Sequence, residues 1–300
     1  MYHRQNRRGP LARLIATAHA MLASLTTMSR EGTPVPDVPA YRRVAAMLFG
    51  RRNDSLVYFE ESVDVTDTLP WIDRWNAAGR PHLTLFLVVL HAMAKTLHEF
   101  PRLNRFVTAG ALYQREGVWL SFTAKRSMEP AAPLVVIKRR FEPGESLEAF
   151  ARAMDERIRT ARRDGDRHGD REMELLLKIP HPVLRRVLAL APALDAWGLL
   201  PSSMRLHDPF FASVFLTNMG SLGADAIYHH LYEYGNIPLF CSLGRARDEV
   251  VARDGQPAVR TIARLRITFD ERVEDGFNAV RALRHLREAI ERPMSVSASE

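Results

Sequence analysis

The spacing of apolar residues along the chain predicts a series of helices. Apolar positions recur every three or four residues in several segments, and helices are therefore expected at 40–52, 68–79, 85–100, 146–163 and 275–291. The third segment is apolar on nearly every face, so this helix must be buried. Asp67, Thr84 and Ser146 stand directly before helices, where their side chains can cap the first turn.

Short runs rich in β-branched and aromatic residues predict the strands. These strands are expected at 55–66, 104–110, 111–117, 118–124, 133–140, 211–220, 235–247 and 258–270. Helices and strands do not alternate strictly, and no glycine-rich phosphate loop occurs. The pattern therefore predicts an α+β fold in which helices pack on a mixed β-sheet, rather than a doubly wound nucleotide fold.

A proline-rich stretch at residues 33–39 marks a boundary near the N-terminus. We expect residues 1–36 to form a poorly ordered or amphipathic tail, residues 37–293 to form one domain, and residues 294–300 to form a second tail. Arg13 interrupts the apolar part of the first tail, and no segment reaches the roughly 18 apolar residues of a membrane span. The sequence therefore predicts a cytoplasmic protein.

A leucine-rich segment occupies the middle of the chain. It is helical in character but contains Pro180, Pro182 and Pro192, so we expect a broken helical insertion at about 171–205. Its leucines would form core, a contact between subunits, or a lipid or membrane-surface patch over 173–200. Because few basic residues flank the leucines, core or subunit contact is favoured.

Composition narrows the classes of partner. The 42 basic residues outnumber the 35 acidic ones, which gives a net charge of +7. No basic face interleaved with aromatic residues occurs, so nucleic acid is not an expected partner. The single cysteine, Cys241, excludes an internal disulfide and lies in an apolar run where a small buried side chain is expected. No three metal ligands share a recognisable spacing, so no metal is expected.

The stretch TFDERVEDG, residues 268–276, carries the most distinctive chemistry, because two acids, Glu271 and Asp275, follow a predicted strand. It lies within residues 253–293, and that segment together with two other stretches, LTLFLVVLHAMAKTLHEFPRLNRFV and VFLTNMGSLGADA, resembles a known family. Residues from about 40 to 293 are similar to the catalytic domain of 2-oxo acid dehydrogenase dihydrolipoyl acyltransferases. That family shares its fold with chloramphenicol acetyltransferase.

The resemblance implies roles for individual residues. The family signature is His-x-x-x-Asp-Gly, in which the histidine is the general base, the aspartate holds the geometry and a separate hydroxyl stabilises the oxyanion. The matching catalytic positions are Glu271 in place of the histidine, Asp275, and Thr217 as the hydroxyl; the supporting positions are Asp270, Arg272, Gly276 and Asn218. The resemblance also implies coenzyme A or acyl-CoA as substrate and a homotrimer with its active-site channel between subunits.

A glutamate in the histidine position changes the expected chemistry. An ordinary glutamate has a pKa of about 4.3, and a thiol has a pKa of about 8.5. Proton transfer from the thiol to the glutamate would therefore cost roughly 5 to 6 kcal/mol, whereas transfer to a histidine would cost about 3 kcal/mol. Burial near Asp275 would narrow this gap. In the alternative arrangement, Arg272 or an arginine of the segment YRRVAAM pairs with one carboxylate, and Glu271 has a structural role.

Other residues leave further alternatives open. His229 and His230 would supply the missing imidazole from a neighbouring loop, or they would be surface or packing residues. Thr217 would stabilise an oxyanion or satisfy nearby backbone groups at a strand end. Two functions follow: a CoA-dependent acyltransferase with non-standard chemistry, or a non-catalytic descendant that serves as an oligomeric scaffold or binds acyl ligands.

Overall fold

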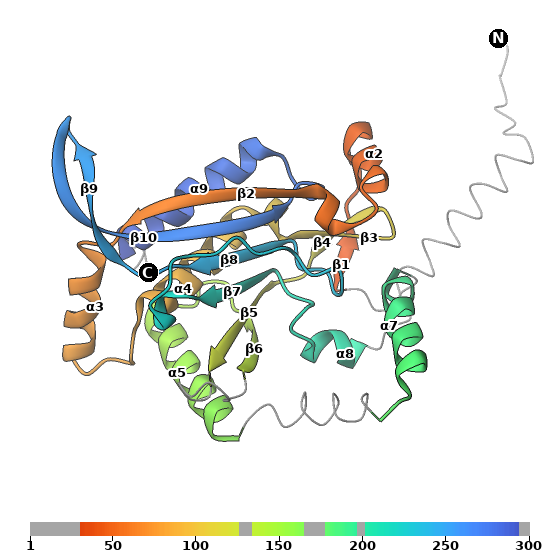
Figure 1. The fold of residues 1–300 in the computed structure, drawn as a ribbon, viewed down its shortest axis with the longest axis horizontal. Coiled ribbons are helices and arrows are strands. Elements are labelled where there is room, and N and C mark those ends of the chain that lie inside the picture. Colours follow the sequence, from red (N-terminus) through yellow and green to blue (C-terminus); the bar gives the residue numbers. More distant parts are fainter. Residues whose placement is uncertain (1–30, 126–133, 165–177, 197–201, 294–300) are drawn as a thin grey trace, which may run out of the picture.

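The computed structural model describes residues 31–125, 134–164, 178–196 and 202–293 (Figure 1). Its helices are α2 (Ala40–Leu48), α3 (Thr68–Ala77), α4 (Leu85–Glu99), α5 (Leu147–Asp164), α7 (His181–Ala196), α8 (Ser202–His207) and α9 (Gly276–Glu291). Its strands are β1 (Gly32–Pro34), β2 (Leu56–Asp64), β3 (Arg105–Thr108), β4 (Ala111–Arg115), β5 (Val118–Lys125), β6 (Leu134–Phe141), β7 (Val214–Asn218), β8 (Leu239–Leu243), β9 (Arg247–Arg253) and β10 (Gln256–Asp270). Short 3-10 helices are η1 (Arg52–Ser55), η2 (Pro101–Asn104) and η3 (Gly220–Leu222).

Among the described residues, seven strands form one mixed sheet that crosses the molecule (Figure 1). Its order is β2-β10-β8-β7-β5-β6, and β9 pairs with the outer part of β10. Strand β7 is parallel to both β5 and β8, whereas the other neighbours are antiparallel. A separate antiparallel sheet has the order β1-β4-β3. The predicted α+β class with a mixed sheet is confirmed.

Helix α4 forms the centre of the core. Nearly every side chain from Phe86 to Leu97 is buried, and the helix contacts α3, α5, α9 and β5. Its first turn is capped as predicted, because the hydroxyl oxygen of Thr84 accepts a hydrogen bond from the backbone N–H of Leu87 at 3.3 Å. Pro101 follows directly and begins η2. The prediction of a buried helix that Pro101 stops is therefore confirmed.

Different elements pack on the two faces of the main sheet. On β10, Leu265 and Ile267 belong to the large core that includes α4 and α9. Phe215 of β7 and Phe240 of β8 belong to a second, smaller cluster with Leu231, which follows η3 in the chain. Because side chains of a strand alternate between faces, the helices cover one face and the segment after η3 packs on the other.

Three local features differ from expectation. Asp67 precedes α3 but its side chain makes no capping bond; its carboxylate instead accepts a hydrogen bond from Arg260 Nη2 at 3.2 Å. Helix α7 continues through Pro192, so the predicted break there is wrong, and the helix forgoes one backbone hydrogen bond at that residue. Strand β1 lies inside the segment predicted as a tail, so regular structure begins earlier than the predicted boundary.

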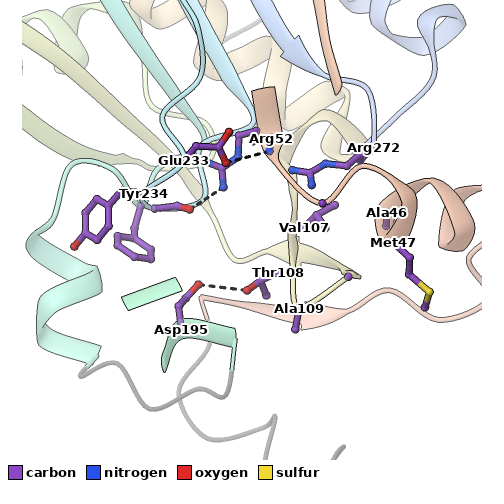
Figure 2. A pocket seen from close by; sticks show the side chains of 14 residues that line it. Ala46, Met47, Arg52, Val107, Thr108, Ala109, Asp195, Glu233, Tyr234 and Arg272 are labelled. Carbon is purple, nitrogen blue, oxygen red and sulfur yellow. Dashed lines mark hydrogen bonds between the residues drawn. The ribbon is translucent and has the colours of Figure 1, made fainter. Parts of the chain in front are cut away.

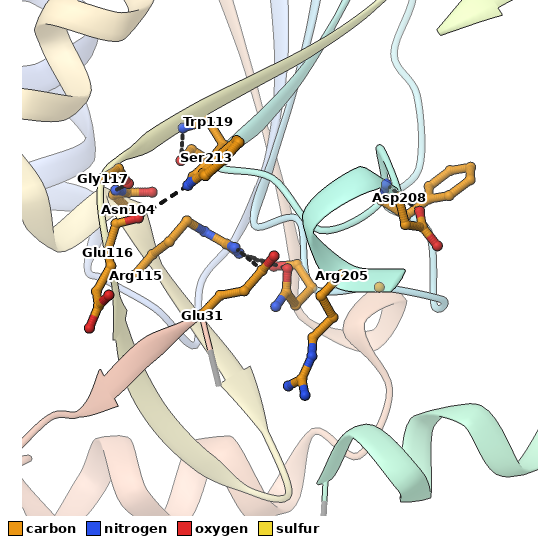
Figure 3. A network of polar contacts seen from close by, with 12 residues as sticks. Glu31, Asn104, Arg115, Glu116, Gly117, Trp119, Arg205, Asp208 and Ser213 are labelled. Carbon is orange, nitrogen blue, oxygen red and sulfur yellow. Dashed lines mark hydrogen bonds and ion pairs between the residues drawn. The ribbon is translucent and has the colours of Figure 1, made fainter. Parts of the chain in front are cut away.

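An ion pair explains why β1 is ordered. Glu31 Oε2 lies 2.7 Å from Nη1 of the buried Arg115 (Figure 3). The other carboxylate oxygen of Glu31 lies 3.6 Å from Lys138 Nζ. The backbone of β1 pairs with β4 at the same place. The ion pair of Glu31 and the pairing of β1 with β4 therefore stabilise the same segment. A pattern of hydrophobic and polar residues does not reveal either interaction. Residues 1–30 and 294–300 lie outside the described residues.

The leucine-rich segment is described only in part, because 171–177 and 197–201 lie outside the described residues. Within α7, Val183 and Leu190 are exposed. The lipid or membrane-surface patch over 173–200 therefore stays a prediction. No described helix is both long and apolar enough to span a membrane.

Candidate functional site

The sequence DERVEDG forms the turn between β10 and α9, here called the signature turn (residues 270–276). Strand β10 ends at Asp270 and α9 begins at Gly276. The Oδ1 atom of Asp275 accepts a hydrogen bond from the backbone N–H of Asn278 at 3.0 Å. This bond satisfies one of the N–H groups that a helix start leaves without a partner. Strand end and helix cap therefore fix both ends of the turn.

Asp270 is locked in a buried ion pair. Its Oδ1 and Oδ2 atoms accept hydrogen bonds from Arg272 Nε and Nη2 at 2.9 and 2.7 Å, and Ser55 Oγ donates to Oδ1 at 2.9 Å. Arg272 Nη1 also donates to the carbonyl oxygen of Phe49 at 2.9 Å. Arg272 thus holds Asp270 and not Glu271, which excludes the first of the two arginine pairings considered from the sequence.

Arg42 of α2 locks the other end of the turn. Its Nη2 atom donates to Glu274 Oε1 at 2.8 Å and to Asp275 Oδ2 at 3.0 Å. The hydrogen bond from the N–H of Asn278 lowers the pKa of Asp275, and the charge of Arg42 lowers it further. Partial burial of the carboxylate opposes this shift. Arg42 belongs to the segment YRRVAAM, so the second predicted pairing, of an arginine in this segment with a carboxylate, is present.

Glu274 is a site residue that sequence reasoning missed. Its side chain is only 1% exposed, and the two residues before it, Arg272 and Val273, are also buried. Besides Arg42, Arg102 Nε and Arg105 Nη1 lie 3.6 and 3.7 Å from its Oε2 atom. Burial lowers the pKa of Arg105, and the charge of Glu274 opposes this shift. The sequence carries no signal for this cluster, because its members come from three separate segments of the chain.

Glu271 is an exposed acid that follows directly after the end of β10. Its backbone N–H donates to the carbonyl oxygen of Ser55 at 3.0 Å, which fixes the position of the residue. Within the part of the chain that the structure describes, no hydrogen bond or ion pair engages the Glu271 carboxylate. The arginine pairing that would make Glu271 a structural residue is therefore not formed among these residues.

Thr217 lies near the end of β7 and is half-buried. Its hydroxyl oxygen is 3.5 Å from that of Thr123. The next residue, Asn218, accepts a hydrogen bond at its Oδ1 from the backbone N–H of Ser221 at 3.1 Å, so Asn218 stabilises the start of η3. The role of Thr217 in catalysis stays a prediction.

Within one chain, Glu271 and Thr217 lie near opposite ends of β8. The backbone N–H of Asp270 donates to the carbonyl of Pro238, directly before β8, whereas Thr217 pairs with Ser242. Four residues of strand at about 3.3 Å each separate the two levels by about 13 Å. A single chain therefore does not bring these two side chains together.

His229 and His230 form part of an aromatic stack. The two rings lie 4.6 Å apart, and His229 stacks on Phe240 at 4.1 Å. The ring nitrogen Nδ1 of each histidine lies within hydrogen-bond distance of the next residue's carbonyl oxygen, at 2.6 and 2.9 Å. None of these contacts involves Glu271 or Asp275. Delivery of an imidazole to the signature turn stays a prediction.

A cavity of about 440 Å³ adjoins the signature turn (Figure 2). Arg272 lines it together with Arg52, whose guanidinium lies 3.9 Å from Asp270 Oδ2. Burial, aided by the neighbouring charge of Arg272, lowers the pKa of Arg52 to about 10. Glu271 is not among the lining residues.

Two further predictions concern cysteine and metal. Burial raises the pKa of Cys241 to about 12, and the thiol lies in the core on β8. A thiol in that position is a small apolar side chain and not a nucleophile. Among the described residues, no group of three or more histidine, cysteine, aspartate or glutamate side chains could hold a metal ion.

Comparison with known proteins finds similarity to the same family that the sequence resembles. Residues 204–298 match the family model "2-oxoacid dehydrogenases acyltransferase (catalytic domain)". No curated protein sequence matches the chain. The cubic core of the pyruvate dehydrogenase multienzyme complex is 18% identical, with a TM-score of 0.57 over 87% of this chain and 93% of that chain.

Two other solved structures are similar. Dihydrolipoamide acetyltransferase of Azotobacter vinelandii is 19% identical, with a TM-score of 0.56 over 87% of this chain and 93% of that chain. In that enzyme, a serine, a histidine and an asparagine four residues after the histidine were investigated for their role in the catalytic mechanism. A chloramphenicol acetyltransferase is 13% identical, with a TM-score of 0.52 over 87% of this chain and 98% of that chain. The chain has this fold, and the predicted resemblance is confirmed.

Proposed function

We propose that the chain is a CoA-dependent acyltransferase-like protein that uses Glu271 in place of the usual histidine, at a site formed between two copies. The observation that carries this proposal is which of the four acids in the signature turn form ion pairs with arginine. Asp270 is paired with Arg272, and Asp275 and Glu274 are paired with Arg42. Glu271 alone of the four presents a carboxylate that can exchange a proton with an incoming group.

The proposed step is proton transfer followed by acyl transfer. The Glu271 carboxylate takes the proton from the thiol of CoA, the thiolate sulfur forms a bond to the acyl carbonyl carbon, and the proton moves to the group that leaves that carbon. In the reverse direction, Glu271 takes the proton of the acceptor and the acceptor forms a bond to the acyl carbon of acyl-CoA. The bond from that carbon to the CoA sulfur breaks, and the leaving thiolate takes the proton. The spacing of four residues between Glu271 and Asp275 equals that between histidine and asparagine in the Azotobacter enzyme.

A carboxylate becomes an effective base toward a thiol only where water is excluded, because burial disfavours its charged form. Exposed apolar side chains lie on the two helices next to the turn: Tyr41 and Val44 on α2 are 65% and 60% exposed, and Phe277 on α9 is 73% exposed. Large exposed apolar surface near a polar site is typical of an interaction surface. A second copy packed here would remove Glu271 from water.

The second copy would also supply the missing hydroxyl. Because one chain holds Glu271 and Thr217 near opposite ends of β8, the Thr217 hydroxyl that stabilises the oxyanion would come from a neighbouring subunit. This arrangement supports the homotrimer that the resemblance implies. The proposal includes a cytoplasmic location, which the single buried cysteine supports.

The test compares variants at position 271. Purified protein is incubated with acetyl-CoA and longer acyl-CoA donors and with thiol, hydroxyl and amine acceptors, and release of free CoA is followed. We expect turnover that falls at least about 100-fold in Glu271→Gln, which keeps the shape and removes the base. Glu271→His should retain or raise turnover. Equal rates for the wild type and Glu271→Gln would refute the proposal.

One observation favours the alternative of a non-catalytic scaffold or acyl-ligand binding protein. The position that corresponds to histidine in the family signature, as the resemblance implies, holds an exposed glutamate here. Light scattering and calorimetry with acyl-CoA distinguish the two functions. A stable oligomer that binds acyl-CoA without turnover supports the alternative, whereas turnover that depends on Glu271 eliminates it.

A further inference from the structure

The cavity beside the signature turn has the size and lining of a small-molecule site. Its volume of about 440 Å³ lies within the range of about 300 to 1,000 Å³ that is usual for ligand pockets. Side chains from α2, α7, the turn between β3 and β4, and residues 233–235 form its walls (Figure 2). Because Glu271 is not part of the lining, the cavity is distinct from the proposed catalytic position.

One end of the cavity carries two buried arginines, Arg52 and Arg272, which are 7% and 6% exposed. Arg52 donates from Nη1 and Nη2 to the carbonyl oxygens of Tyr232 and Gly235. A guanidinium has five N–H groups, so these bonds and those of Arg272 leave donors on both side chains. Asp270 is the carboxylate that both guanidiniums approach, at 3.9 and 2.7 Å.

Glu233 lies at the same end but is engaged with the protein. Its carboxylate oxygens accept hydrogen bonds from the backbone N–H groups of Arg52 and Asn53, at 3.1 and 3.0 Å, and from Asn53 Nδ2 at 2.6 Å. These three bonds hold η1 against the segment that follows η3. The spare N–H donors of the two arginines are therefore suited to a carboxylate from outside the chain.

At the opposite end of the cavity, Asp195 forms an ion pair with the buried Arg205, whose Nη1 lies 3.4 Å from Asp195 Oδ1. The Asp195 carboxylate of α7 lies there with the Thr108 hydroxyl, which donates to Asp195 Oδ2 at 3.4 Å (Figure 2). This pair can accept a hydrogen bond from a hydroxyl or amino group of a ligand. Between the two ends, Ala46, Met47 and Val107 give the cavity an apolar wall.

We propose that this cavity binds a small carboxylic acid that carries a hydroxyl or amino group at the far end of a short aliphatic chain. The carboxylate would lie at Arg52 and Arg272, the chain against Met47 and Val107, and the far polar group at Asp195 and Thr108. The proposal concerns binding alone and does not depend on acyl transfer at Glu271.

The first test measures ligand preference by calorimetry with the full chain. The probes are 4-hydroxybutyrate, butyrate and 1,4-butanediol, with hydroxy acids one and two methylenes longer. We expect saturable binding of a hydroxy acid, at least about fivefold weaker binding of the matching acid without hydroxyl, and at least about tenfold weaker binding of the diol. No saturation with any acid at concentrations up to about 100 mM, far above a weak Kd of 1 mM, would overturn the proposal.

The second test uses variants that leave the arginine network intact. Met47 is 71% exposed at the edge of the cavity, so Met47→Trp should fold and fill the space, while Met47→Leu is the matched control. We expect binding to be lost in Met47→Trp and kept in Met47→Leu. Thr108→Val, which keeps the shape of the side chain, should reduce the preference for the hydroxy acid. Unchanged binding in Met47→Trp, or an unchanged preference in Thr108→Val, would contradict the proposed site.

Discussion

Removal of Arg42 is the perturbation that tests how the signature turn is held. The guanidinium bonds to Glu274 at 2.8 Å and to Asp275 at 3.0 Å, and the Glu274 side chain is 1% exposed. In an Arg42→Met variant, Arg102 and Arg105 remain at 3.6 and 3.7 Å, beyond hydrogen-bond distance. Loss of one partner of a buried ion pair costs about 3 to 5 kcal/mol. Because Asp275 is 45% exposed, we expect a loss of about 3 kcal/mol, at the lower end of that range.

The assay is equilibrium unfolding in urea at pH 7 and one fixed protein concentration. The matched control is Arg43→Met, since Arg43 is the exposed neighbour on the same helix and should change the free energy of unfolding by less than about 0.5 kcal/mol. The double variant Arg42→Met/Glu274→Gln should recover part of the loss, because the uncompensated buried charge is gone. A loss in Arg42→Met no larger than that in Arg43→Met would refute the reasoning, as would a double variant less stable than Arg42→Met.

The pH dependence of the same comparison has a definite sign. The pKa of Asp275 is lowered in the folded state, so its ionised form adds stability above the unfolded pKa of about 3.9. This stability is lost as the pH falls through the folded pKa. The difference between wild type and Arg42→Met should therefore be nearly constant from about pH 5 to pH 8 and become smaller below about pH 4.

Three further predictions concern single residues. Burial lowers the pKa of Lys138 to about 8 from 10.5, so the unfolded chain binds more protons between these values; stability should rise with pH across this window in the wild type, and Lys138→Met should lack the rise. Cys241 should resist alkylation at pH 8 until urea unfolds the protein, and rapid labelling of the native protein would contradict its burial. Gly255 has a φ of 77° in the turn between β9 and β10, with open space around it, so Gly255→Ala should cost about 1 kcal/mol of unfolding free energy, and no measurable cost would contradict the left-handed turn.

Much of the architecture could be predicted from the sequence because its signals are local. Thr84 before an apolar run and Pro101 after it specify α4, and the strands around it follow from β-branched runs. Asp275 was expected at the start of the last helix and is its N-cap. Pro192 shows the limit of such reasoning, because a helix can lose one backbone hydrogen bond where the surrounding structure sustains it.

The candidate site was predicted only in part because its contacts are between distant segments. Glu271 and Asp275 were found from the spacing of the signature, but the buried state of Glu274 depends on Arg42, which lies more than two hundred residues earlier in the chain. The cavity formed with Arg52 likewise depends on segments that meet only in the folded chain. The two glutamates of the turn thus differ in pairing, because Arg42 reaches Glu274 whereas no described arginine pairs with Glu271.

The central claim, that Glu271 of one copy acts with Thr217 of another, is tested most directly by complementation. Glu271→Gln and Thr217→Val subunits are unfolded together in equal amounts, refolded and assayed for acyl transfer, with each variant refolded alone as control. Random assembly of an oligomer with sites between subunits makes about a quarter of the sites intact, since half of the subunits carry each functional side chain. The account predicts recovery to about a quarter of the wild-type rate. A mixed sample no more active than the single variants would contradict it.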